Sequence, residues 1–317
     1  MAIQGIFGPI APEALGQTLM HEHITCADWS MRMNFGEKFF SFDQVASMAE
    51  GQLGKAKALG VHTVVDGTPV NLGRDIRLIR EVARRTGLNF IASTGFYYQE
   101  EPWLGMRDEE QIYDLLMGDC ADGISGTDSK PGILKAGVGR AGLTPLLRKV
   151  LHATGRVARE TGLPLFCHHD PAIKNGGEIL DLLAECGVPA SRVILGHSGD
   201  TTDLEYLTAM LERGCWLGMD RFGFCDKDLA LEPRVDTIAA LCKAGWGRRL
   251  LLSHDWAAYL AFWDSWETTR NSDWMHLEED YTFIHRRVLP ALREKGLDQA
   301  AVDALLVDNP RAFFTGE

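Results

Sequence analysis

The chain has 317 residues, 45% of them hydrophobic, and carries a formal net charge of −12 at pH 7. Nucleic acids and anionic membrane surfaces bind clusters of Lys and Arg, so this negative balance argues against both as partners. No segment approaches the roughly 20 consecutive apolar residues that span a bilayer. The 7 cysteines are scattered and form no CxxC pair, which favours a reducing, cytoplasmic location over a disulfide framework.

Short apolar runs alternate with longer amphipathic stretches along the whole chain. Each run begins almost wholly apolar, as expected of a parallel strand that is buried on both faces. The stretches between them, such as 42–60, 74–87 and 178–187, have apolar residues at the three- and four-residue spacing of helices, and all three end in Gly. Segment 277–314 predicts two closing helices. The predicted strands are 18–23, 62–68, 88–95, 132–137, 163–169, 192–199, 215–220 and 249–255.

Eight strands separated by helices predict an α/β protein with a single (β/α)8 TIM barrel over residues 1–317. A doubly wound open sheet is the alternative for such a pattern. That fold usually has a Gly-rich turn after its first strand, and this sequence has none there. We therefore favour the barrel.

Every predicted strand turns polar at its carboxyl end, which is the end that carries the active site in such barrels. His21 and His23 lie two residues apart on one strand, so their side chains share a face. A lone HxH pair is often only packed, but His168, His197 and Asp255 end three further strands. Neutral imidazole is a common ligand of zinc, and buried carboxylates need partners, so the pattern predicts a metal centre at the C-terminal face.

Lys135 ends the predicted strand GILKAG, where a free ammonium would be repelled by metal ions. Its side chain could instead reach solvent or pair with a carboxylate. Alternatively, a carboxylated lysine (N6-carboxylysine) would be neutralised and would offer two oxygens that bridge two ions. The position of Lys135 between the histidine-bearing strands favours the carboxylated form.

The sequence resembles the phosphotriesterase family of the amidohydrolase superfamily, including its phosphotriesterase-like lactonase branch, over its whole length. The most specific segments are HEH at 21–23, the Lys135 strand, GHSGDTTDLEYL at 196–207 and SHDW at 253–256. The resemblance implies a homodimer and two divalent ions per chain. It implies that one ion is held by His21, His23 and Asp255, that the other is held by His168 and His197, and that carboxylated Lys135 bridges them.

A hydroxide bridging two such ions would attack a lactone carbonyl or a phosphoryl centre, and Asp255 would take up its proton. The mixed nitrogen and oxygen ligands fit zinc first, and also iron, cobalt or manganese. Strand alternation turns His254 away from the site, and the resemblance selects His168 over the adjacent His169.

The substrate is a small molecule whose identity depends on weaker signals. Tyr97 and Arg221 resemble positions that line the lactonase pocket, although Arg221 could pair with Asp220 or Asp200 and Tyr97 could simply pack. Trp256 and Trp263 belong to a Trp-rich segment that suits an apolar group or a dimer contact.

This segment and the stretch after His168 differ from the lactonases, so the acyl group stays open. A lactone is the first expectation. The alternatives are a phosphotriester, an ester or amide of an aromatic compound, a mononuclear deaminase-type site, or a metal-bearing binding protein without turnover.

Overall fold

The structure is a computed structural model that describes residues 2–222, 229–261 and 280–317. Its main sheet contains parallel strands in the order β10-β9-β8-β7-β6-β5-β4-β3-β11. A separate antiparallel pair, β1 (Ile3–Gly5) and β2 (Gly8–Ile10), precedes it. The sheet strands are β3 (Gln17–Ala27), β4 (Val61–Asp66), β5 (Asn89–Gly95), β6 (Ile133–Gly137), β7 (Leu165–His168), β8 (Val193–Gly196), β9 (Trp216–Met219), β10 (Leu250–Leu252) and β11 (Ala257–Ala261).

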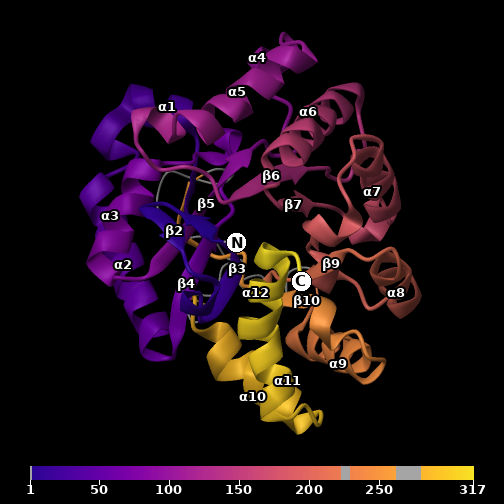
Figure 1. Cartoon of the computed structure of the whole chain (residues 1–317). Coiled ribbons are helices and arrows are strands. Elements are labelled where there is room, and N and C mark those ends of the chain that lie inside the picture. The colour runs from indigo at the N-terminus through magenta and orange to yellow at the C-terminus, as the bar shows by residue number, and fades with distance from the viewer. Residues whose placement is uncertain (1, 223–228, 262–279) are drawn as a thin grey trace.

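Helices surround this sheet, and both termini lie in front of the barrel strands in the same view (Figure 1). The chain closes with two helical segments after residue 283. The first begins with a π-helical turn, Ile284–Val288, and the second contains one in its middle, Ala304–Asp308. The described helices are α1 (Trp29–Phe35), α2 (Phe42–Ala58), α3 (Ile76–Thr86), α4 (Pro102–Gly105), α5 (Glu109–Ala121), α6 (Pro145–Thr161), α7 (Gly176–Glu185), α8 (Leu204–Glu212), α9 (Leu231–Lys243), α10 (Leu289–Glu294), α11 (Gln299–Asp303) and α12 (Asn309–Thr315).

Helix α6 shows how the sequence sets these elements. The Thr144 side chain accepts a hydrogen bond from Leu147 N, and Pro145 occupies the first turn, where its missing N–H is not needed. Gly162 ends the helix with a φ of 72°, a left-handed conformation that suits glycine. The helix buries one face at three- and four-residue spacing against the sheet, so local signals and tertiary packing agree.

The eighth barrel strand is divided into β10 and β11 by residues 253–256. Asp255 N donates to His21 O at 3.0 Å and His23 N donates to Trp256 O at 2.8 Å, so the dividing segment is bonded directly to β3. Strand β11 then continues parallel to the second half of β3, with Ala257 opposite His23. These contacts close the barrel.

A one-residue bulge lies in β3 at Met20 and His21, where the HEH motif begins. Leu19 pairs with Val64 and Glu22 pairs with Asp66, so two residues of β3 face one residue of β4. A bulge of this kind redirects the side chains that follow it. Here Met20 contributes to the apolar interior, and the bulge lets His21 and His23 also face inward while Glu22 faces outward.

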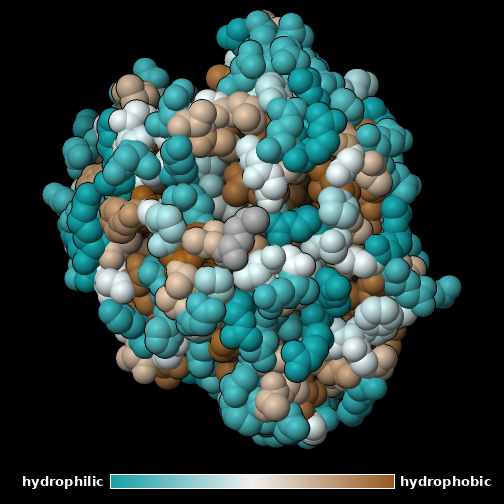
Figure 2. Space-filling model, in the orientation of Figure 1, coloured by the Kyte–Doolittle hydropathy of each residue, from teal (hydrophilic) through white to brown (hydrophobic). Residues whose placement is uncertain are grey.

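The lower barrel interior is a compact apolar layer, which we call the floor. One residue from each barrel strand contributes to it, and Ile3, Leu15, Phe313 and Phe314 cover it from the N- and C-terminal segments. On the face that carries both termini, hydrophilic surface predominates and apolar surface appears in small patches (Figure 2). The strand residues of the floor are Met20, Val65, Ile91, Ile133, Phe166, Ile194, Trp216 and Leu251.

The architecture confirms the predicted α/β barrel, with β11 as a strand that the sequence did not indicate. The predicted eighth strand, 249–255, was too long at its carboxyl end, because its last residues form the dividing segment. Within the described residues, no helix combines the length and apolar character needed to cross a membrane.

Candidate metal centre

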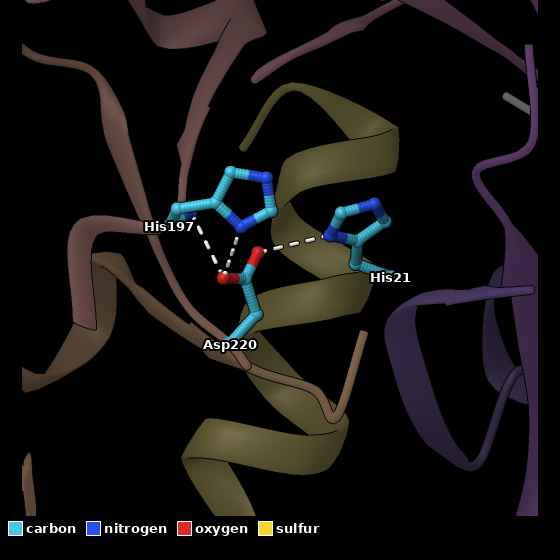
Figure 3. Close-up of side chains that lie close together, drawn as sticks. All are labelled: His21, His197 and Asp220. Carbon is cyan, nitrogen blue, oxygen red and sulfur yellow. Dashed lines mark hydrogen bonds and ion pairs between the residues drawn. The ribbon is translucent and has the colours of Figure 1, made fainter. Parts of the chain in front are cut away.

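Asp220 joins histidines from two distant strands. It follows β9, and its Oδ2 lies 3.0 Å from His21 Nδ1 while its Oδ1 lies 2.9 Å from His197 Nδ1 (Figure 3). The backbone N–H of His197 donates to the same Oδ1 at 2.9 Å. Burial raises the pKa of Asp220, and the neighbouring Asp255 and Asp200 raise it further, whereas the positive charges of Arg221 and Lys135 lower it. With Nδ1 of both rings directed at Asp220, both Nε2 atoms are left to face the site.

His168 and His197 direct one ring nitrogen each at the other. His168 Nδ1 lies 2.6 Å from His197 Nε2, and the two ring centroids are 4.2 Å apart. Burial lowers the pKa of both imidazoles well below the usual value, so both are neutral at pH 7. Two neutral imidazole nitrogens converging in a buried site are a suitable pair of ligands for a divalent ion.

His23 and Asp255 form the other side of the site. His23 Nε2 lies 3.0 Å from Asp255 Oδ1, and its Nδ1 donates to the Thr68 hydroxyl at 2.8 Å. Burial lowers the pKa of His23, but contacts with Cys26 and Asp255 outweigh it and raise the pKa to about 10. A proton therefore lies between His23 and Asp255 in the metal-free chain, at a place where a cation is favoured.

Lys135 lies inside the site. Its Nζ is 2.7 Å from His21 Nε2 and 4.0 Å from the centre of the Phe166 ring, and the side chain is buried. Burial lowers the pKa of this amine to about 8. Gly67 makes room for the pair, since a Cβ there would lie 2.6 Å from His21 Cδ2.

We call the ring of residues at the carboxyl ends of the barrel strands the rim. Three rim residues adopt left-handed backbone conformations that are unfavourable outside glycine: His197 (φ 64°), Arg221 (φ 63°) and Asp255 (φ 56°). Arg221 donates to Asp255 Oδ2 at 3.3 Å and to Asp200 Oδ2 at 2.6 Å. Burial opposes ionisation of Asp255, but His21, His23 and Arg221 hold its pKa well below the usual range. Asp255 is therefore a carboxylate that faces both histidines and Arg221.

A cavity of about 720 Å³ opens beside this cluster. It lies over the loops that follow β5, β6, β7, β8 and β9. His168, Asp200 and Arg221 form its inner end, and Arg140 pairs with Asp170 at 3.0 Å nearer the solvent. The cavity is large enough for a small organic molecule.

The predicted ligands His21, His23, Lys135, His168, His197 and Asp255 all meet at this end of the barrel. His21, His23 and Asp255 offer ligand atoms within 4.8 Å of one another, as do His21, His197 and Asp220. The adjacent His169 is directed elsewhere, toward Gly196 O at 2.5 Å.

The predicted substrate residues are placed less uniformly. Arg221 lines the cavity, and Tyr97 is buried with its ring edge-on to His168 at 5.1 Å. The structure does not bring Trp256 to the cavity: it is buried in the core, and its indole N–H donates to Gln52 on α2 at 3.0 Å. Trp263 lies outside the described residues.

Sequence reasoning missed the residues that orient the ligands. Asp220 was considered only as a partner for Arg221. It is the polar residue that ends the apolar run CWLGMD, and Asp255, a predicted metal ligand, ends its own predicted strand in the same way. Thr68 follows another strand end, in DGT, and Tyr98 packs on His168 with ring centroids 4.7 Å apart. Asp220, Thr68 and Tyr98 contact ligands that come from other strands, so their roles depend on which strands are neighbours in the barrel.

Several known proteins resemble this chain over nearly its full length. The family model described as the phosphotriesterase family matches residues 1–314. A phosphotriesterase homology protein of Mycobacterium tuberculosis is 37% identical over 317 residues, with 97% of this chain and 95% of that protein covered. An aryldialkylphosphatase of Saccharolobus solfataricus is 30% identical over 310 residues, covering 96% and 97%. An N-acetyltaurine hydrolase of Rattus norvegicus is 26% identical over 357 residues, covering 99% and 97%.

Proposed function

The chain belongs to the phosphotriesterase family and is a metal-dependent hydrolase, and we propose that it hydrolyses a lactone at a site for two divalent ions. The family uses a binuclear metal centre. The observation that carries the proposal is the convergence of four imidazoles, one carboxylate and one buried lysine at the carboxyl ends of the barrel strands. When bound, a pair of divalent ions supplies a hydroxide at neutral pH and polarises the oxygen of the scissile group.

His21, His23 and Asp255 would hold one ion and His168 and His197 the other, with Lys135 between them. The buried amine of Lys135 supports its carboxylation, because a pKa of about 8 leaves a useful fraction neutral near pH 7. The neutral amine forms an N–C bond to CO2 and releases one proton, which gives a carbamate with two oxygens. This carbamate would replace a repelled cation with a bridging anion.

Asp255 would receive the proton that the nucleophile loses. Its Oδ2 faces Arg221, which also contacts Asp200 on the solvent side of the site. The guanidinium keeps Asp255 ionised, and it fixes the carboxylate in one orientation. Arg221 also lines the cavity, where a guanidinium suits a carbonyl or ring oxygen of a substrate.

The inner cavity supports a lactone as substrate. Tyr98 and His168 give it an aromatic wall, and Arg221 gives it one strong donor. A phosphotriester is the second candidate, because the aryldialkylphosphatase relative is 30% identical along nearly the whole chain. An N-acyl amide is the third, since the relatives include N-acetyltaurine hydrolases.

The deciding experiment compares hydrolysis of a lactone panel, an aryl phosphotriester and aryl or N-acyl amides by the metal-loaded protein. Lactones should give the highest kcat/KM. Asp255→Asn should retain the fold and lose at least about a hundredfold in kcat, the magnitude typical of a removed general base. A preference for phosphotriester or amide would replace the lactone assignment. Near wild-type turnover of Asp255→Asn with both ions bound would refute the proton route.

Three further assignments follow from the same reasoning. Zinc is the first choice of metal, with iron, cobalt or manganese also suited to nitrogen and oxygen ligands. The described cysteines are free, which supports a reducing, cytoplasmic location. A homodimer is the proposed assembly; sedimentation velocity of the metal-loaded protein tests it, and a single species of 35.1 kDa would contradict it.

A further inference from the structure

Glu22 lies between His21 and His23 in the sequence but faces away from them. It is fully buried, and its carboxylate accepts four hydrogen bonds. Its Oε1 accepts from the Ser253 hydroxyl at 2.8 Å, from His254 N at 2.9 Å and from His254 Nδ1 at 2.7 Å. Its Oε2 accepts from Trp256 N at 3.0 Å. All four donors therefore belong to the segment that divides β10 from β11.

That segment holds Asp255 in its left-handed conformation. The backbone N–H groups of His254 and Trp256, on either side of Asp255, are both bonded to Glu22. The N–H of Asp255 itself donates to His21 O at 3.0 Å. A left-handed conformation is unfavourable for most non-glycine residues, so Asp255, with a φ of 56°, is held there by its surroundings. One buried carboxylate supplies that restraint on both sides.

His254 extends the restraint to the C-terminal part of the barrel. Because its Nδ1 donates to Glu22, its Nε2 is free to accept, and Ile284 N donates to it at 3.1 Å. The Tyr281 hydroxyl donates to His23 O at 2.5 Å nearby. The orientation of His254 away from the metal site thus has a use: it connects Glu22 to the helical segment that closes the barrel.

We propose that Glu22 is a positioning residue that sets Asp255 for metal binding and thereby completes the ligand set of His21, His23 and Asp255. Glu22 contacts no ion and no substrate; it acts through the backbone of residues 253–256. The inference rests on the proposed two-metal function. It implies that loss of Glu22 weakens one ion site and spares the site of His168 and His197, where Asp220 rather than Glu22 orients His197.

The test is Glu22→Gln, which keeps the size of the side chain but replaces one accepting oxygen with an NH2 group that faces N–H donors. Zinc content per chain is measured after dialysis, and zinc affinity is measured by competition with a chromophoric chelator. We expect one ion to bind as in wild type and the other about 10- to 100-fold more weakly, the range for lost orienting contacts. Two ions bound with wild-type affinity would overturn the proposal, as would equal weakening of both.

The matched control is Asp119→Asn. Asp119 is another largely buried carboxylate, held by Arg74 at 2.8 Å and by the Thr94 hydroxyl at 2.6 Å, and it contacts none of the metal-site residues. This variant should lose thermal stability but bind both ions normally. If Glu22 acted only on global stability, the two variants would give the same metal-binding curve, which would also overturn the proposal.

A milder variant decides the question if Glu22→Gln does not fold. Ser253→Ala removes one of the four donors, and with it the hydroxyl that accepts from His21 N at 2.7 Å. It should weaken the same ion by about 2- to 10-fold, a loss on the scale of one hydrogen bond. Unchanged affinity for both ions would refute the positioning role. Failure of the two-metal function is distinguishable, because the wild-type chain and Asp119→Asn would then also bind fewer than two ions.

Discussion

The floor of the barrel is filled by apolar side chains, one from each strand, whereas the rim on the same strands is lined by imidazoles, carboxylates and Lys135. Every positive-φ residue among these two layers, apart from glycines, belongs to the rim: His197, Arg221 and Asp255. The floor follows strand alternation, while the rim needs a bulge in β3 and a break in the eighth strand. The comparison indicates that the floor stabilises the fold and allows an unfavourable geometry at the rim.

Lys135→Met is expected to have the largest effect on activity and metal binding, and this effect should be limited to the rim. It removes the proposed bridging group, so nearly all hydrolysis and at least one ion per chain should be lost. The metal-free variant should be at least as stable as wild type, because an apolar side chain replaces a buried amine over Phe166. Elemental analysis and thermal unfolding check both parts. Retention of two ions with full activity would contradict the bridging role.

Leu251→Ala is the converse change, confined to the floor. Leu251 is 1% exposed and lies one layer below the ligands. Its truncation should lower the free energy of unfolding by about 2–5 kcal/mol, because it leaves a cavity. Urea unfolding of the metal-free protein measures this loss. The folded variant should still bind two ions, and loss of either ion would show that the two layers are not separable.

Asp220→Asn should weaken both ion sites, since Asp220 contacts His21 and His197, which belong to different ligand sets. An asparagine can accept from only one of the two imidazoles, so we expect affinity to fall by about 10- to 100-fold. Chelator competition measures both constants. This outcome differs from that of Glu22→Gln, and selective weakening of one ion would contradict the shared role of Asp220.

The smallest expected effect is a pH dependence of metal loading. Burial lowers the pKa of Lys135 to about 8, and only the neutral amine reacts with CO2. At a fixed concentration of dissolved CO2, carboxylation and zinc loading of the metal-free chain should therefore accelerate about tenfold from pH 7 to pH 9, as the neutral fraction rises.

The lowered pKa of Lys135 also makes the stability of the metal-free protein depend on pH. Between pH 8 and 10.5 the unfolded chain binds a proton that folded Lys135 does not, so Lys135 contributes stability as pH rises through that window. His23, whose pKa is raised to about 10, contributes in the opposite direction in both proteins. The expected result is therefore a stability difference between metal-free wild type and Lys135→Met that shifts in favour of wild type as pH rises. Stopped-flow loading and thermal unfolding across pH test both statements. Loading and stability curves that match those of Lys135→Met would contradict them.

The barrel, and the position of the six proposed ligands at one end of it, could be predicted from the sequence. Both follow from apolar runs with polar carboxyl ends, which are visible locally in the sequence. The sequence could not predict the bulge in β3, since Met20, His21 and Glu22 carry no mark of the register between β3 and β4. Simple alternation would have placed Met20 and Glu22 on the same face.

Strand β11 and Trp256 show the same limitation. The segment after Asp255 was interpreted from its Trp content, as one that suits an apolar group or a dimer contact, but pairing with β3 makes Ala257–Ala261 a strand. The contact of Trp256 with Gln52 joins residues 204 positions apart. Such pairings depend on the assembled barrel, and the same is true of the Asp220 contacts.

The division of the eighth strand has a consequence for access. Strands β3 and β11 continue together past the metal ligands to Ala27 and Ala261, and they raise the barrel wall on one side. The described cavity lies on the other side, over the strands from β5 to β9. Much of its lining comes from three segments, 98–100, 139–147 and 168–172. Changes in these three segments can alter which molecules are admitted while the tall side of the wall keeps its shape.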